Sequence, residues 1–202
     1  MTSSLPLLLF ILLGLIGCKP PPCETDKPIP LQFLASSDAE VNQGDDGEAW
    51  PVFYYVFELS AKPPDAALKN PALLAEDLGL LGDTLLTAHE RHAYPGKSES
   101  WTVTLAAKAE FVLVVTLYRR IVGDSWHYMS SVPEGHHQRV CDAKRRKEPP
   151  PPPSCVYLRF SGYEIRGGTF PPPGFDVSAF STTCAPVLLK TPNKRDRKRR
   201  QR

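Results

Sequence analysis

The stretch Val52–Leu59, with the sequence VFYYVFEL, decides more about the fold than any other segment of the chain. It is rich in aromatic and β-branched side chains, the residue types that favour the pleated and buried surface of a strand. Phe53, Tyr55, Phe57 and Leu59 fall on one face, because successive side chains of a strand point to opposite sides. We therefore expect a core strand of a β-sheet here.

Five other segments have strand-like patterns, while one segment has a different spacing. The strand-like segments are 29–36, 101–105, 111–118, 126–132 and 156–166. Residues 29–36 alternate as a half-buried strand does. Residues 111–118 are apolar on both faces and should form a central strand. Between residues 65 and 94 the leucines are spaced more like those of helices, and glycines break this segment into short pieces. Many strands with one helical insertion predict a mainly β protein, folded as a β-sandwich.

The N-terminus reads as an export signal. The apolar run Leu5–Ile16 is too short for a bilayer core, which needs ~20 helical residues, but it suits a signal peptide. Its end, Leu15-Ile16-Gly17-Cys18, resembles the bacterial lipobox, in which the cysteine is acylated and becomes the first mature residue. We expect residues 1–17 to be a signal peptide and residues 18–28, which are proline-rich, to be a lipidated tether. By resemblance to enterobacterial sorting rules, Lys19 favours the outer membrane.

Charge is distributed unevenly along the chain. The formal net charge is +2, but residues 193–202 carry seven Lys or Arg and one Asp. So dense a charge run is expected to be disordered. Such a tail could bind nucleic acid electrostatically, but a periplasmic location argues against nucleic acid as the partner. Anionic lipid headgroups or lipopolysaccharide phosphates are nearer at hand, and a solubilising tail is an equal alternative. A second basic cluster, residues 144–147, precedes a run of five prolines.

The chain has five cysteines. With Cys18 lipidated, four remain, and an even number in an exported protein predicts two disulfides. Cys141 and Cys155 bracket the basic and proline-rich segment, so a bond between them would close the base of a hairpin. That bond, one of three pairing schemes, would leave Cys23 with Cys184. A metal site is the rival interpretation, but no CxxC or Cys/His pair has the spacing of metal ligands.

The remaining motifs give no sign of catalysis. A zinc helix needs histidines at i and i+4, whereas His89 and His92 are three residues apart, at what we expect to be a surface helix end. His136 and His137 are expected in an exposed turn. Neither a Gly-x-Ser-x-Gly motif nor a phosphate-binding glycine loop is present. We therefore expect no enzymatic activity, no metal site and no cofactor besides the covalent lipid.

Three blocks in the middle of the chain carry a further pattern. The first block, Asn42–Leu59, has an asparagine, a glycine-containing loop and a strand. The second contains Leu81–Leu86 and Pro95-Gly96, and the third, Phe111–Trp126, contains Tyr118-Arg119-Arg120-Ile121. In their order and spacing these blocks resemble the TssJ (SciN) lipoproteins of the bacterial type VI secretion system. With the lipobox, the resemblance covers about residues 18–166.

This resemblance implies a fold and a role. The fold is a transthyretin-like two-sheet β-sandwich with a small helical insertion, expected over residues 29–192 including a C-terminal extension. The role is structural: the outer-membrane lipoprotein of the trans-envelope TssJ–TssL–TssM complex, which binds the periplasmic C-terminal domain of TssM. The alternative is a periplasmic lipoprotein whose transthyretin-like sandwich binds a small ligand, cell wall or lipopolysaccharide.

The family's partner contact lies in the loop between its first two strands, and the matching segment here is acidic. An acidic loop would steer a basic partner face and mainly raise the association rate. A solvated turn with no partner is the simpler alternative. The candidate partner-binding residues are Asp38, Glu40, Asn42, Gly44, Asp45, Asp46, Glu48 and Trp50.

Overall fold

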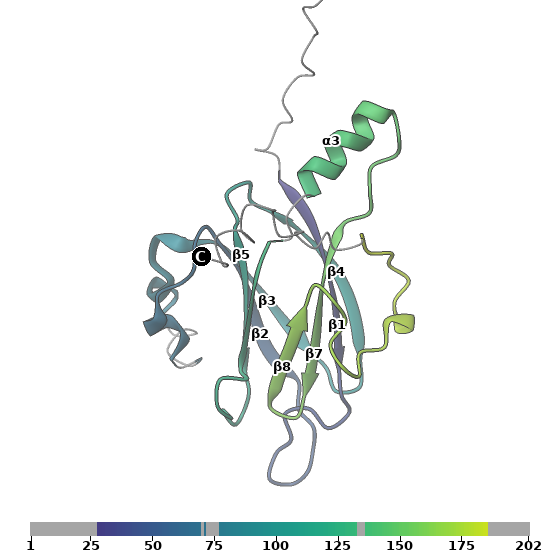
Figure 1. Cartoon of the computed structure of the whole chain (residues 1–202). Coiled ribbons are helices and arrows are strands. Elements are labelled where there is room, and N and C mark those ends of the chain that lie inside the picture. Colours follow the sequence, from purple (N-terminus) through teal and green to yellow (C-terminus); the bar gives the residue numbers. More distant parts are fainter. Residues whose placement is uncertain (1–27, 70, 72–76, 133–135, 186–202) are drawn as a thin grey trace, which may run out of the picture.

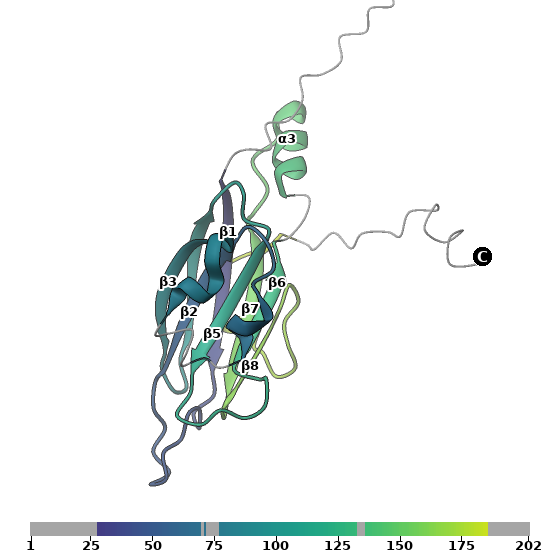
Figure 2. The same ribbon diagram turned by 90° about the vertical axis from the view of Figure 1, so that its left-hand side faces the viewer.

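The structure is a computed structural model that describes residues 28–69, 71, 77–132 and 136–185. Two four-stranded sheets pack face to face as a β-sandwich (Figures 1 and 2). The predicted mainly β, two-sheet architecture is therefore confirmed. In the described part of the chain, none of the helices combines the length and the apolar character that a bilayer crossing requires. The predicted signal peptide and the basic tail lie outside the described residues, as does all of the tether except Pro28.

The first sheet has the strand order β4-β1-β7-β8. Its strands are β1 (Ile29–Ser37), β4 (Ser98–Leu105), β7 (Ser154–Ser161) and β8 (Glu164–Gly168). β1 pairs antiparallel with β4 but parallel with β7, so the sheet places the first strand of the domain beside a strand near its C-terminal end. The half-buried character predicted for β1 is wrong, since Leu34 is 2% exposed on the outer face. It lies opposite Tyr157, whose ring packs edge-on against Phe175 of the C-terminal extension.

The second sheet has the strand order β3-β2-β5-β6. Its strands are β2 (Val52–Leu59), β3 (Leu85–Ala93), β5 (Phe111–Leu117) and β6 (His127–Ser131). β2 and β5 are central, as their apolar sequences predict, and each is paired antiparallel on both sides.

Aromatic side chains fill the space between the sheets. The ring of Tyr54 on β2 lies 4.9 Å from that of Phe160 and 6.1 Å from that of Trp101, both in the first sheet. Trp101 stacks on Phe33 at 5.1 Å. The face of β2 that meets the other sheet therefore carries Tyr54, and its hydroxyl donates a 3.0 Å hydrogen bond to Glu99. A buried tyrosine needs such a partner, since an unsatisfied hydroxyl costs about 1–3 kcal/mol.

The helical prediction for residues 65–94 is only partly correct. Short 3-10 helices occupy Asp65–Leu68 (η2) and Leu78–Thr84 (η3), but residues 85–93 form the edge strand β3. η3 contains a kink at Gly82, where φ is 54°. β3 then pairs with β2, so tertiary pairing overrides the helix-like leucine spacing.

Two further predictions were wrong at local level. Residues 141–155 were expected to form a hairpin loop, but the 11-residue helix α3 covers His136–Arg146. His136 and His137 thus begin a helix and do not lie in a turn. The single strand predicted over 156–166 is a hairpin, because Gly162 turns the chain with a φ of 56° between β7 and β8.

The predicted disulfide pairing was also wrong. Cys155 is bonded to Cys184, with a Cα–Cα distance of 5.5 Å. This bond excludes both Cys141–Cys155 and Cys23–Cys184. The reason is that Cys141 lies on α3, whereas the extension returns to the start of β7, where Ala185 donates a backbone hydrogen bond to Pro153. The disulfide thus holds the extension against the first sheet.

Replacing Cys184 by serine should lower the free energy of unfolding by about 3 kcal/mol, because the bond closes a loop of 29 residues. Denaturant unfolding under oxidising conditions measures this difference. Under reducing conditions the variant and the wild type should unfold alike, and a difference that persists there would contradict the assigned role of the bond.

Candidate partner-binding end of the sandwich

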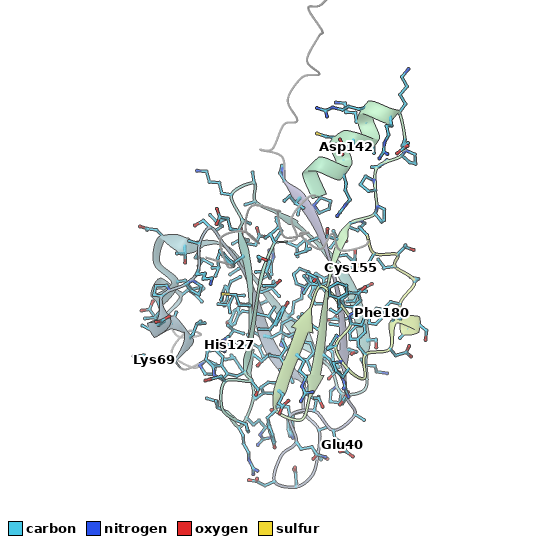
Figure 3. The ribbon with its side chains drawn as sticks, in the orientation of Figure 1. Glu40, Lys69, His127, Asp142, Cys155 and Phe180 are labelled. Carbon is cyan, nitrogen blue, oxygen red and sulfur yellow. A yellow bond between two sulfur atoms is a disulfide. The ribbon has the colours of Figure 1, made fainter. Side chains whose placement is uncertain are left out.

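The loop of residues 38–50 joins β1 to β2 at one end of the sandwich. Figures 1 and 3 place this loop, where Glu40 is labelled, at the end opposite α3, where Asp142 is labelled. The end of β5 and the β7–β8 turn lie at the same end. We call this region the loop end.

Asp38 anchors the base of the loop to β7. The guanidinium of Arg159 donates two hydrogen bonds to the carboxylate of Asp38, at 2.9 and 3.2 Å, and the Ser161 hydroxyl donates a third at 2.7 Å. Arg159 also donates to the carbonyl of Pro173 in the extension. Asp38, predicted to be partner-binding, therefore has a structural role, because its charge is matched inside the molecule.

Asn42 joins the loop to two other segments. Its side-chain amide donates to the Pro51 carbonyl at 3.0 Å, and its side-chain oxygen accepts from the Arg119 backbone at 2.8 Å. Its own backbone N–H donates to Gly162 at 2.7 Å. The residue is 3% exposed and has a φ of 52°, a conformation that asparagine tolerates better than most residues. Asn42 was predicted to contact a partner, but it is buried and holds the loop in place.

The loop tip is a small hydrogen-bonded turn. Gln43 and Ala49 form a β-bridge, and Gly44 donates a backbone hydrogen bond to Glu48 at 2.8 Å. The Asp46 carboxylate accepts from the backbone N–H of Glu48 at 3.1 Å, and Gly47 turns the chain with a φ of 81°. These bonds give the tip a defined shape before any partner arrives.

Two arginines from the segment after β5 lie against the loop. Arg119 lies over the ring of Trp50, 5.1 Å from its centroid, and Arg120 forms an ion pair with Asp45. Arg120 also lies 5.9 Å from the ring centroid of Tyr163, whose hydroxyl donates to the Gln43 carbonyl. Both arginines belong to the Tyr118–Ile121 motif of the family resemblance, but the sequence prediction of the partner-binding site included only the loop.

Three large apolar side chains in the loop and directly after the arginines are exposed. Trp50, Ile121 and Val122 are 43%, 48% and 50% exposed. Tyr118, which precedes the arginines, is buried and donates to the Glu164 carbonyl, and burial holds the pKa of its hydroxyl far above the ordinary value. The tyrosine therefore stays a neutral donor that links the end of β5 to the start of β8.

The structure divides the predicted site residues into two groups. Asp38 and Asn42 are structural, and Asp45 is paired with Arg120. The remaining carboxylates of the loop, those of Glu40, Asp46 and Glu48, are exposed at the tip. Gly44 and Trp50 lie beside them, in contact with the arginine segment.

The histidines of the described region do not form a metal site. His89 and His92 lie on β3, where residues three apart point to opposite faces, so the predicted surface helix end is wrong. His89 contacts the buried carboxylate of Glu58 at 2.9 Å, and Glu58 also accepts from the Ala106 backbone. Within residues 28–69, 71, 77–132 and 136–185, no group of three or more His, Cys, Asp or Glu could hold a metal.

Comparison with known proteins adds family information to this geometry. Residues 29–145 match the family model described as type VI secretion lipoprotein, VasD, EvfM, TssJ. Lip of Serratia marcescens, a membrane-bound component of the type VI secretion system, has a similar fold, with a TM-score of 0.59 and 17% identity over 72% of this chain and 99% of that chain. The T6SS lipoprotein TssJ1 of Pseudomonas aeruginosa also has a similar fold, with a TM-score of 0.54 and 20% identity over 72% of this chain and 99% of that chain.

A chain of a type VI membrane complex gives a TM-score of 0.52 and 16% identity, over 69% of this chain and 96% of that chain. At these identities the structural matches show the fold alone. A search of curated protein sequences finds no significant match.

Proposed function

This chain belongs to the TssJ family of type VI secretion lipoproteins, and we propose that it anchors the trans-envelope TssJ–TssL–TssM complex to the outer membrane. In this proposal the acyl groups on Cys18 hold the membrane, and the loop end binds the periplasmic C-terminal domain of TssM. The family consists of structural lipoproteins, and we infer no enzymatic activity and no cofactor for this member.

The placement of the loop supports this division of labour. Eleven residues separate Cys18 from Ile29, the start of β1, so the tether joins the sandwich at the end where β1 begins, which we call the anchor end. β1 then runs for nine residues, about 30 Å, towards the loop end. A loop that lies at the far end from the anchor faces away from the outer membrane, towards an inner-membrane partner.

The observation that carries the partner assignment is a rigid and acidic tip. Glu40, Asp46 and Glu48 are exposed there, while hydrogen bonds to Asp38 and Asn42 fix the base of the loop. The loop carries more carboxylates than the two arginines that lie against it, and such a net negative charge attracts a basic partner surface and raises the association rate. Preorganisation of the loop further lowers the entropy cost of binding.

Charge reversal at the tip tests the assignment. The double change Glu40→Lys and Glu48→Lys should lower the association rate with the TssM periplasmic domain by roughly tenfold at low salt, with a smaller effect at high salt. Surface plasmon resonance measures this rate. Neither side chain takes part in the anchoring bonds of the loop base, so the fold should be unchanged.

The matched control reverses two exposed carboxylates at the opposite end, Asp83→Lys and Glu110→Lys. This control should associate at the wild-type rate. If the association rates of the control and of the tip variant fall by the same factor, the effect is one of net charge and the tip is not the contact. If neither variant binds more weakly, the assigned partner surface is wrong.

The cavity between the sheets gives the ligand-binding alternative little support. The pocket beside Ala35, Ala93 and Phe160 has a volume of about 20 Å³, space for roughly one water molecule. A small-molecule site needs several hundred Å³. A wider, open hollow of about 430 Å³ lies beside α3, lined by residues of the helix and of the segment that follows it, and not between the sheets. The space between the sheets therefore favours the scaffold role over a ligand-binding sandwich.

The proposal retains two predictions about the ends of the chain, which lie outside the described residues. They are a signal peptide over residues 1–17 followed by a lipidated tether over 18–28, and a disordered basic tail over 193–202, which either contacts anionic lipid or lipopolysaccharide or serves only as a solubilising tail. The domain between them is the sandwich with its extension, residues 29–192.

A new disulfide pairing replaces the one that the structure excludes. Cys141 is disulfide-bonded, and Cys155 and Cys184 are bonded to each other. With Cys18 acylated, Cys23 is the only remaining cysteine of the sequence. We therefore propose a Cys23–Cys141 bond, which a peptide map of the unreduced mature protein would reveal as one cross-linked peptide pair.

A further inference from the structure

Helix α3 and the residue that follows it form a basic cluster outside the proposed partner site. Between residues 139 and 148 the chain carries five basic and two acidic side chains. Lys144, Arg145, Arg146 and Lys147 are all exposed. Arg145 and Arg146 contact Asp142 and Glu148 at 3.8 and 3.2 Å, so three positive charges remain in excess. Net positive charge at this density attracts anionic surfaces.

The helix stands at the anchor end of the molecule. Figures 1 and 2 show α3 projecting beyond both sheets, at the end where β1 begins. It is attached to the sandwich through Arg139, which donates a 2.8 Å hydrogen bond to Ser154 at the start of β7. A Cys23–Cys141 bond would place the helix within five residues, about 18 Å of extended chain, of the acylated Cys18.

The helix dipole explains only part of this charge. Basic side chains in the last turn of a helix interact favourably with its negative end, which accounts for Lys144, Arg145 and Arg146 without any membrane. Lys147 lies beyond the last turn, with a φ of 56°. Its N–H donates to Lys144 and that of Glu148 donates to Ala143, a capping pattern in which glycine is the usual residue.

A lysine at this position is disfavoured by its Cβ atom. A glycine would end the helix without that strain, so the favourable interaction of a lysine with the helix C-terminus is opposed by a backbone cost at this position. A headgroup contact gives a reason for a lysine here, since a lysine near an anionic leaflet adds to membrane affinity.

We propose that the exposed basic side chains of residues 144–147 bind the phosphate-bearing headgroups of anionic lipids in the membrane that holds the Cys18 anchor. This inference rests on the proposed anchor. It adds a second attachment point, so that the sandwich stands with its loop end away from the bilayer and does not pivot on the tether.

Lysine footprinting of the mature acylated protein on vesicles tests the contact. The vesicles are either pure phosphatidylcholine or phosphatidylcholine with phosphatidylglycerol, and an amine-reactive reagent labels exposed lysines before mass spectrometry. Lys144 and Lys147 should label at least about fivefold more slowly on the anionic vesicles, the fold-change expected for one favourable headgroup contact. Roughly 0.5 M salt should remove the protection while the protein stays bound through its lipid.

Lys97 is the internal control, because it is exposed in the turn before β4, at the loop end. It should label equally on both vesicles. The variant Lys147→Gly should fold at least as well as the wild type, and protection of Lys144 should decrease in it. The matched variant Lys97→Gly should leave that protection unchanged.

The outcomes separate the two proposals. Flotation with both kinds of vesicle but equal labelling of Lys144 and Lys147 overturns the helix contact and leaves the anchor standing. Protection confined to Lys194 and Lys198 overturns it in favour of the tail. A protein that floats only with anionic vesicles, with Lys144 protected, supports the helix contact and contradicts the anchor. Flotation with neither kind contradicts both.

Discussion

Replacement of Cys18 by serine is expected to abolish outer-membrane anchoring, and with it type VI secretion. Acyl chains on the cysteine would supply nearly all the membrane affinity, since each buried methylene contributes about 0.8 kcal/mol. Serine offers no thiol for acylation, so the variant should leave the membrane fraction. Fractionation of the cell envelope and export of a secretion substrate measure the two consequences.

The same variant should keep the folded domain and its partner affinity. Cys18 precedes the first residue of β1 by eleven residues of sequence. Binding of the purified variant to the TssM periplasmic domain should therefore match that of the wild type. Full secretion by a variant that mass spectrometry shows to be unacylated would refute the proposed anchoring role.

The change Asn42→Ala should lower the free energy of unfolding by about 3 kcal/mol. Alanine leaves the Pro51 carbonyl and the Arg119 N–H without their side-chain partners, and each buried unsatisfied group costs about 1–3 kcal/mol. For a chain of this size the midpoint of thermal unfolding should fall by about 6–12 °C. Because the loop base loosens, partner association should weaken as well.

Two further variants separate the causes. Asn42→Gly removes the same hydrogen bonds but accepts the φ of 52° without strain, so it should be less destabilising than alanine. Asn42→Asp keeps the acceptor for Arg119, but it loses the donor to Pro51 and places a carboxylate at a buried position, so it should be at least as destabilising as alanine. If alanine and wild type unfold at the same denaturant concentration, Asn42 does not hold the loop.

The sequence predicts best those elements whose burial is visible locally. VFYYVFEL at 52–59 and the apolar run at 111–117 became the central strands β2 and β5, because such residues fit a strand covered on both sides. α3 was missed because its charged sequence lacks the apolar stripe by which helices are recognised. β3 was missed because its leucines satisfy a helical spacing, and pairing with β2 decides its conformation.

The same limit applies to the site. The family resemblance pointed to the loop of residues 38–50, but neither it nor the acidic character of the loop distinguished anchoring residues from exposed ones. Asp38 meets Arg159 across 121 residues of sequence, and Asn42 meets Arg119 across 77. Contacts at such separations leave no local pattern. They are created when the sheets assemble, and only the fold shows that Glu40, Asp46 and Glu48 remain exposed.

The parallel pairing of β1 with β7 has a consequence for the order of biogenesis. Leu31 and Ser154 are neighbours in the sheet, so the first strand of the domain has to wait for one of the last. Closing so long a loop is slow and entropically unfavourable. In the proposed export, the N-terminal region would cross the inner membrane before β1 can pair with β7. The proposed acylation of Cys18 would then precede closure of the sandwich, which requires the C-terminal half of the chain.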